Sequence, residues 1–393
     1  MPAASPRPVY MMHSTTSPLD PRVRAVMAPL LDEDPASPGG LLADSGLASR
    51  LVEEARERVG SWLNAAGWSV VFTSGGTESC NLALKGAALA RLARGGRPGR
   101  VVACATEHLC VLHPARTLGK LGFEVLEAPV DSHGLIDLER LEGLLCSDVV
   151  LVTVAAANGE TGTMQPMEAI AAMAHRRGAL LHSDACILAA YRRPDLGELK
   201  ADLVSVSAHK MGGPRGIGAL AVRDGVRLLP LLEGGVEEGG LRAGAPYVAG
   251  IAGFGEAALL KGSAASGQEE RMETLGKEME SLLLGIDGVR LNGHPARRLR
   301  GMVNVSAEGV DGEAVLLKLA RRGIAASSGS SCYHQAGKPS HVLTAMGVPA
   351  ERAAGSVLFS LGPASTRQDV DRAGDVFAQA VRALRALAPG RPG

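Results

Sequence analysis

The stretch VVFTSGGTESCNLALKG, residues 70–86, decides how this chain folds. Its first part, 70–74, is apolar enough to form a buried strand, and two glycines and a threonine follow closely. From Glu78 a segment rich in Ala and Leu continues to Arg94, which is long enough for a helix. A strand that turns over glycine into a helix is the repeating unit of an α/β fold.

The same unit recurs downstream as far as residue 222. The apolar runs show no alternation, and helix-length segments such as 167–177 separate several of them. Strands of this kind form mostly parallel sheets that are covered by helices on both faces. The sequence therefore predicts an α/β fold with a seven-stranded, mostly parallel sheet in a large domain, residues 10–261. The runs expected to form its strands are 70–74, 101–105, 123–130, 149–157, 179–185, 203–207 and 217–222.

The tail of the chain has a different pattern, in which one long helix precedes a mixture of short strands and helices. This order predicts a smaller C-terminal α+β domain over residues 262–393, which also carries the segment around Cys332. The expected elements are helices at 268–287, 313–322 and 366–387 and strands at 302–306 and 324–327.

Composition excludes several classes of protein. The chain has 393 residues with 41 Lys+Arg against 41 Asp+Glu, so no net charge favours nucleic acid or a membrane surface as a partner. Its longest apolar run, 149–157, is less than half the roughly 20 residues of a membrane helix, and the N-terminus lacks a signal peptide's apolar core. Six cysteines without a CxxC pair or zinc-type spacing predict a cytoplasmic protein with reduced thiols and no metal site.

The residues after each strand are candidates for a site, because ligands of parallel sheets bind beyond the carboxyl ends of the strands. After the first run, Gly76 lets backbone N–H groups approach an anion at a helix N-terminus, and Thr77 adds a hydroxyl. These residues predict a phosphate cradle. The alternative is an ordinary strand-to-helix turn with a capping residue, and this segment alone does not decide between the two.

Three further strand ends carry polar side chains. Asp184 can hold a protonated pyridine nitrogen there, although a solvated loop residue or a helix cap would show the same pattern. Lys210, one of eight lysines, lies in a Gly-rich turn where an amine can form a Schiff base with a carbonyl cofactor. Ser207 and His209 flank it and could bind the same cofactor's phosphate. His108 could stack on a planar cofactor and move protons, although a lone histidine is more often structural.

Taken in order along the chain, these motifs resemble those of the cysteine desulfurases, which are class V aminotransferase-like, fold type I enzymes of pyridoxal phosphate. The resemblance extends from about Tyr10 to Gly362, which is nearly the whole chain. The matching motifs are FTSGGTESCNLALKG (72–86), TEHLCVL (106–112), NGETGTMQP (158–166), HSDA (182–185), SVSAHKMGGPRGIGAL (205–220), GGLRAG (239–244), SSGSSC (327–332) and PSHVLTAMG (339–347).

The resemblance implies a role for each candidate residue. Lys210 would hold pyridoxal 5′-phosphate as a Schiff base, Asp184 would pair with the pyridinium nitrogen, and His108 would stack on the ring. Arg242 matches an arginine that reaches the neighbouring subunit's site in this family, so a homodimer is implied. The phosphate would be held by Gly76, Thr77, Ser207 and His209.

Cys332 matches the loop cysteine that takes sulfur from the substrate as a persulfide and passes it to an acceptor. The residues support this role independently, because Cys332 lies in the Gly/Ser-rich, aperiodic stretch SSGSSCYHQAGK and a nucleophilic thiol must be exposed. His334 and Lys338 are close enough in sequence to favour the thiolate. The other five cysteines are expected to be small buried hydrophobic residues.

The sequence departs from the family where the cofactor ring and the substrate are bound. Gly159 and Ile187 stand where the family has an Asn and a Gln that reach the ring hydroxyl, so two side-chain donors are missing. Leu358 replaces the arginine that clamps the substrate carboxylate, which should weaken the binding of a free amino acid. Three other arginines are candidates to compensate: Arg215, Arg352 and Arg367.

Three functions follow from these observations. The first is a desulfurase that converts L-cysteine, or a related thiol amino acid, into alanine and a Cys332 persulfide. The second is a pyridoxal-phosphate lyase that acts on a modified amino acid or biosynthetic intermediate, as Leu358 would allow. The third is a non-catalytic sulfur-carrier scaffold. A working enzyme is expected, because Lys210, Asp184 and His108 are retained while the departures cluster on contacts to the substrate and the ring.

Overall fold

The computed structural model describes residues 7–32, 43–263, 265–329 and 339–387. Within these residues a seven-stranded sheet has the strand order β2-β8-β7-β6-β5-β3-β4, and β8 runs antiparallel to both of its neighbours. The prediction of a mostly parallel, seven-stranded sheet is confirmed. Its strands are β2 (Trp68–Thr73), β3 (Arg100–Cys104), β4 (Glu124–Ala128), β5 (Val149–Thr153), β6 (Leu180–Asp184), β7 (Leu203–Ser207) and β8 (Gly218–Arg223).

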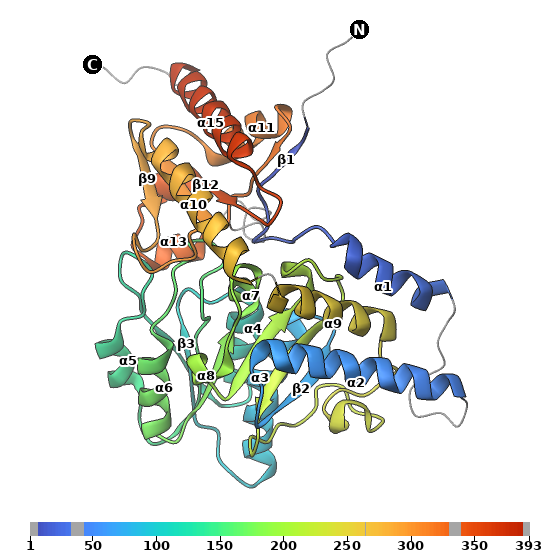
Figure 1. The fold of residues 1–393 in the computed structure, drawn as a ribbon. Coiled ribbons are helices and arrows are strands. Elements are labelled where there is room, and N and C mark those ends of the chain that lie inside the picture. The colour runs from blue at the N-terminus through green and yellow to red at the C-terminus, as the bar shows by residue number, and fades with distance from the viewer. Residues whose placement is uncertain (1–6, 33–42, 264, 330–338, 388–393) are drawn as a thin grey trace.

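Helices cover both faces of this sheet. They are α1 (Pro21–Asp32), α2 (Ala43–Leu63), α3 (Gly76–Ala93), α4 (Leu109–Gly119), α5 (Leu138–Leu144), α6 (Met167–Arg176), α7 (Cys186–Tyr191), α8 (Leu196–Leu199) and α9 (Val248–Ser263). Helices α3 and α4 share a core with Val101, whereas α2, α6 and α9 share a separate core with its neighbour Val102, which points to the opposite face. Figure 1 shows α1, α2 and α9 running side by side along one flank. No helix in the described parts of the chain is both long and apolar enough to cross a membrane.

The central strands bring their carboxyl ends together. Every residue of β5 and β7 is buried, as expected for strands covered on both faces. In the parallel register Thr153 pairs with His182, and Asp184 pairs with Ser205. Strands β5, β6 and β7 therefore end at the same edge, and the polar residues that follow them are placed next to one another.

A second, antiparallel sheet has the order β12-β10-β9. The elements of this part are α10 (Ala265–Leu284), β9 (Val289–Asn292), β10 (Met302–Ala307), α11 (Gly312–Arg321), β11 (Ile324–Ala325), α13 (His341–Ala345), α14 (Ala350–Ala354), β12 (Ser356–Ser360) and α15 (Arg367–Leu387). Three helices, α10, α11 and α15, contribute to its core. The division of the chain at residue 261 stays a prediction, and α9 runs across that position.

The N-terminal segment packs against the C-terminal elements. Strand β1 (Val9–Tyr10) pairs in parallel with β11, and Val9 and Met11 are buried in the core of the C-terminal elements. Figure 1 shows this blue strand beside the red and orange helices. The following segment then crosses to the large sheet, where it reaches the residues after β7.

Candidate active site

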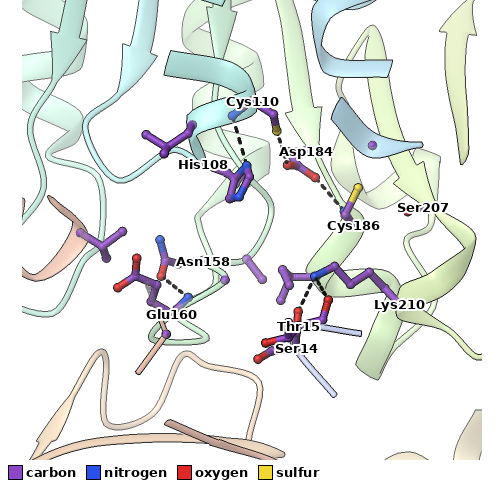
Figure 2. Close-up of a pocket in the computed structure, with 18 of the residues that line it drawn as sticks. Ser14, Thr15, His108, Cys110, Asn158, Glu160, Asp184, Cys186, Ser207 and Lys210 are labelled. Atoms are coloured by element: carbon purple, nitrogen blue, oxygen red, sulfur yellow. Dashed lines mark hydrogen bonds between the residues drawn. The ribbon is translucent and has the colours of Figure 1, made fainter. Parts of the chain in front are cut away.

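A pocket with a volume of about 330 Å³ lies beyond the carboxyl edge of the large sheet. Figure 2 shows His108, Asp184 and Lys210 around this common space. Arg242 is not among the described residues that line it, and Cys332 lies outside the described residues. Seven of the residues that the sequence singled out do line it: Gly76, Thr77, His108, Asp184, Ser207, His209 and Lys210.

The turn between β2 and α3 forms one wall of the pocket. Gly75 has a φ of 146°, which favours glycine, and α3 begins at Gly76. A Cβ atom on Gly76 would lie 2.6 Å from the Sγ atom of Cys186, so no larger residue fits there without movement. Ser207 lies next to Gly76, and its hydroxyl is buried and has no hydrogen-bond partner among the described residues. The backbone and this hydroxyl are thus left available to a ligand.

Asp184 and His108 are held by the first turns of two helices. The carboxylate of Asp184 accepts the Cys186 backbone N–H at 2.9 Å, and its other oxygen lies 3.9 Å from the Cys110 sulfur. His108 is the N-cap of α4, where its Nδ1 atom accepts the Cys110 backbone N–H at 3.1 Å. The side-chain interaction with Cys110 raises the pKa of His108, against the lowering effect of burial. Both side chains are therefore oriented before any ligand binds.

The Lys210 amine is held by the N-terminal segment. Its Nζ atom donates hydrogen bonds to the backbone carbonyls of Ser14 and Thr15, the latter at 2.8 Å (Figure 2). The Ser17 hydroxyl in turn donates to the carbonyl of Lys210 at 2.9 Å. His209 lies within 3.1 Å of the Thr16 hydroxyl, and burial lowers the pKa of this histidine to about 4. A neutral His209 can still donate one hydrogen bond.

Ser360 ties this segment to the C-terminal sheet. Its hydroxyl oxygen accepts from the backbone N–H of Ser14 and from the Ser14 hydroxyl, each at 3.0 Å. The same hydroxyl lies 3.2 Å from the carbonyl oxygen of Met11. Sequence reasoning missed Ser14, Thr15 and Ser360, because residues so far apart in the chain share no motif.

Two buried carboxyl groups belong to this region, and one of them, Glu160, lines the pocket. Glu107 is 1% exposed, and burial raises its pKa to about 8. One of its oxygens accepts the backbone N–H of Ala155, and the other has no partner among the described residues. Glu160 accepts a hydrogen bond from Ser340 at 2.5 Å, and burial raises its pKa to about 7. Both carboxyl groups favour their neutral forms in this setting.

Comparison with known proteins places this arrangement in a family. Residues 9–373 match the family model described as Aminotransferase class-V. The chain belongs to this family. A class-V relative, the cysteine desulfurase IscS 1 of Archaeoglobus fulgidus, is 40% identical over 380 residues, which cover 97% of this chain and 98% of the relative. The predicted resemblance to the cysteine desulfurases is thereby confirmed.

Solved structures of class-V relatives have the same fold. A NifS-like protein superposes with a TM-score of 0.88 at 31% identity, covering 96% of this chain and all of its own. SspA in complex with cysteine superposes with a TM-score of 0.79 at 30% identity, covering 91% of this chain and all of its own. These likenesses extend through both sheets.

Pyridoxal 5′-phosphate is the cofactor of this class-V chain, as it is for its cysteine desulfurase relatives. The described residues fit such a molecule. The glycine turn and the buried, unpartnered Ser207 hydroxyl suit a phosphate. Asp184 offers a carboxylate for a protonated ring nitrogen, and Lys210 offers the only lysine amine among the described residues that line the pocket.

Arg242 takes a position beside the phosphate cradle rather than inside the pocket. Its Nε atom forms an ion pair with Glu78 at 3.2 Å, and Glu78 also accepts the backbone N–H of Ser74 at 2.7 Å. The resemblance implies a role for Arg242 in the site of a neighbouring subunit, and Arg242 is not among the described residues that line this chain's own pocket. A contact to the cofactor of a second subunit stays a prediction.

Two of the three departures from the family line the pocket, whereas Leu358 is not among the described residues that line it. Gly159 and Ile187 both line the pocket, and a Cβ atom on Gly159 would lie 3.4 Å from the Ile187 side chain. Leu358 is fully buried in β12, where its backbone N–H bonds to the Ser327 carbonyl at 2.6 Å. No arginine is among the described residues that line the pocket, so Arg215, Arg352 and Arg367 do not replace the missing one there.

The cysteines differ from the expectation of five buried hydrophobic side chains. Cys80, Cys104 and Cys186 are buried, but Cys110 and Cys146 are only half-buried. Cys110 lines the pocket, because α4 begins beside it and directs the first turn toward Asp184. The side-chain interaction with Cys80 lowers the pKa of the Cys110 thiol to about 7, whereas the same contact and burial raise that of Cys80.

Proposed function

We propose that this protein is a pyridoxal 5′-phosphate-dependent cysteine desulfurase that removes sulfur from L-cysteine and releases alanine. The observation that carries this proposal is the convergence of an amine, a carboxylate and a phosphate cradle in one pocket, provided by Lys210, Asp184 and Gly76. Family membership supports it, since a relative with this activity is 40% identical over nearly its full length. A more distant relative, SspA, has been solved with cysteine bound.

The described residues can perform the steps that this reaction requires. When bound, the cofactor supplies an aldehyde that condenses with amines and a ring that accepts electron density from the substrate's α-carbon. Asp184 would keep the ring nitrogen protonated, and His108 would stack on the ring, since both residues line the pocket. Lys210, with its amine released, would take the substrate's α-proton on Nζ. The carbonyls of Ser14 and Thr15 keep that released amine within reach.

We assign acceptance of the sulfur to Cys332. The described residues on both sides of its segment support this, because Gly329 and His341 line the pocket. The Cys332 thiolate would attack the substrate sulfur, so that a sulfur–sulfur bond forms as the carbon–sulfur bond breaks. The electron pair of the broken bond stays with the substrate carbon, which takes up a proton and leaves as alanine. A persulfide remains on Cys332. An acceptor protein then takes this sulfur. A Cys332→Ser variant should bind L-cysteine, as seen in the cofactor's visible spectrum, but should release no sulfur.

The lack of an arginine among the described lining residues supports a second candidate, a lyase that acts on a modified amino acid. A free amino acid presents a carboxylate, and a bidentate arginine contact is among the stronger polar contacts for it. Because Leu358 is buried and no described lining residue is an arginine, a substrate recognised through another group would suit this pocket better. The carbon–sulfur chemistry would then be replaced by elimination or another reaction at the α- and β-carbons.

Alanine production separates these two functions. The cofactor-saturated protein is incubated with L-cysteine, and alanine and sulfide are measured against a Lys210→Ala background. Alanine above that background supports the desulfurase, and its absence rejects L-cysteine as the substrate. Leu358→Arg should then raise turnover of L-cysteine, with Leu358→Met as the control for the change in shape. No gain from the arginine would favour the lyase.

We also propose that the protein acts as a homodimer in the cytoplasm. Apolar side chains gather on the segment that carries Arg242, where Leu232, Val236 and Tyr247 are 47%, 89% and 44% exposed. Such a patch is suited to burial against a second copy. The five described cysteines are free thiols, which suits a reducing compartment. Light scattering of the purified protein tests the dimer.

A further inference from the structure

Two thiols and a carboxylate converge beside the pocket. Cys80 comes from α3 and is fully buried, Cys110 comes from the first turn of α4, and Asp184 ends β6. One ligand atom from each of the three lies within 4.8 Å of the other two. Figure 2 shows the Cys110 sulfur pointing toward Asp184, at 3.9 Å from the nearer carboxylate oxygen. No sequence motif predicts this cluster, because its members lie on three different elements.

The separations suit a thiophilic divalent cation. In a tetrahedral zinc site, bonds of about 2.3 Å to sulfur and about 2.1 Å to oxygen place neighbouring ligand atoms roughly 3.6–3.8 Å apart. The Cys110–Asp184 separation of 3.9 Å is close to that, and the other two pairs of ligand atoms lie within 4.8 Å. Two thiolates and one carboxylate form a donor set that zinc and cadmium accept. A fourth position can be filled from the pocket, which Cys110 and Asp184 both line.

A nearby third thiol does not belong to this cluster. Cys186 also lies beside Asp184, to which its backbone N–H donates. Its sulfur, however, lies 3.7 Å from the carbonyl of Ser205 and next to Gly76, on the phosphate side of the pocket. Cys186 therefore provides a control thiol that also interacts with the Asp184 carboxylate but lies outside the group of three ligand atoms.

We propose that Cys80, Cys110 and Asp184 bind one thiophilic divalent cation of the zinc or cadmium type, and that this cation competes with the cofactor. Competition rests on the proposed function, in which the Asp184 carboxylate holds the protonated ring nitrogen. The Asp184 carboxylate cannot bind a metal ion and a pyridinium nitrogen together without weakening its interaction with each. Metal binding releases the thiol protons, so it weakens as the solution is made acidic.

Cadmium binding to the full-length protein tests the site. A Cys332→Ser background removes the thiol proposed as the sulfur carrier, and all variants are made in it. Cadmium added to cofactor-free protein should produce a thiolate-to-metal absorbance band that saturates at one ion per chain. Cys80→Ala and Cys110→Ala should each weaken binding by more than about tenfold. Cys186→Ala should weaken cadmium binding much less than either of these variants, because its sulfur lies outside the cluster.

The controls keep the site and the proposed function separable. Far-ultraviolet circular dichroism shows whether each variant is folded. If Cys80→Ala is unfolded, the cadmium affinities of Cys110→Ala and Cys186→Ala are compared instead. Equal loss in Cys110→Ala and Cys186→Ala, or no saturable band, would overturn the site. Cofactor-saturated protein should bind cadmium at least about tenfold more weakly. Equal cadmium affinity in protein whose visible spectrum shows bound cofactor would overturn the competition but not the enzyme.

Discussion

Replacing Glu107 with glutamine is expected to remove a large pH dependence from the stability of the folded chain. Glu107 is 1% exposed, and burial, followed by the negative charge of Asp184, raises the pKa of its carboxyl group to about 8. The hydrogen bond from the Ala155 backbone N–H opposes this shift but does not cancel it. Glutamine keeps an acceptor for Ala155 and cannot ionise.

The sign and size of the effect follow from linkage. The carboxyl group has a pKa of 4.5 as its ordinary value and about 8 in the folded chain, so the folded state holds the proton more tightly. The resulting stabilisation is fully present below about pH 4.5 and is lost as the pH rises toward 8. Between pH 5 and pH 8 the free energy of unfolding should fall by about 3 kcal/mol through this group, at roughly 1.4 kcal/mol per pH unit.

Urea unfolding of the cofactor-free protein at pH 5 and pH 8 measures this difference. Fluorescence of Trp62 and Trp68, in α2 and β2, reports on the large sheet. The drop in stability between the two pH values should be smaller in Glu107→Gln than in the natural chain by about 3 kcal/mol. Glu54 is exposed, and Glu54→Gln serves as the control variant. It should show the same drop in stability between the two pH values as the natural chain. An equal drop in the natural chain and in Glu107→Gln would refute the reasoning.

Three further changes test other contacts of the site. Ser207→Ala should weaken cofactor binding roughly tenfold in a titration of cofactor-free protein, because the buried hydroxyl is assigned to the phosphate; unchanged affinity would remove that assignment. Ser360→Ala should shift the pH midpoint of the cofactor's visible band, because Ser14 then loses the hydroxyl that holds its carbonyl beside the Lys210 amine. Ser360→Thr keeps a hydroxyl and should keep the natural midpoint. Glu238→Gln should lower stability by roughly 2 kcal/mol in thermal unfolding, because Arg56 loses the charge that faces it at 2.7 Å; an unaltered melting temperature would contradict this.

The large sheet was predictable because strands that are buried on both faces are apolar along their whole length. Strands such as β5 (VVLVT) are apolar at every position, and helices of ordinary length separate them. The small sheet was only partly predictable. Strand β9 has four residues with an uneven burial pattern, and β12 completes its pairing with β10 only after a long intervening stretch. Strand β1 depends on a partner more than 300 residues away, which no local pattern indicates.

The site was predictable where residues follow a strand. Asp184, Ser207 and Lys210 lie together because parallel strands end at one edge of the sheet. Ser14 and Thr15 were not predictable, since they reach Lys210 through a segment that has no secondary-structure pattern of its own. The exposure of Cys110 was not predictable either, because it depends on the angle at which α4 begins rather than on hydrophobicity.

The central claim is that Lys210 carries the cofactor in this pocket, and borohydride reduction followed by peptide mass mapping tests it most directly. Reduction fixes the bond between the cofactor and the amine that holds it. The account predicts that the added pyridoxyl mass lies on the peptide containing Lys210 and disappears in Lys210→Ala. A label on a different lysine, or no label in protein that retains the cofactor, would contradict it.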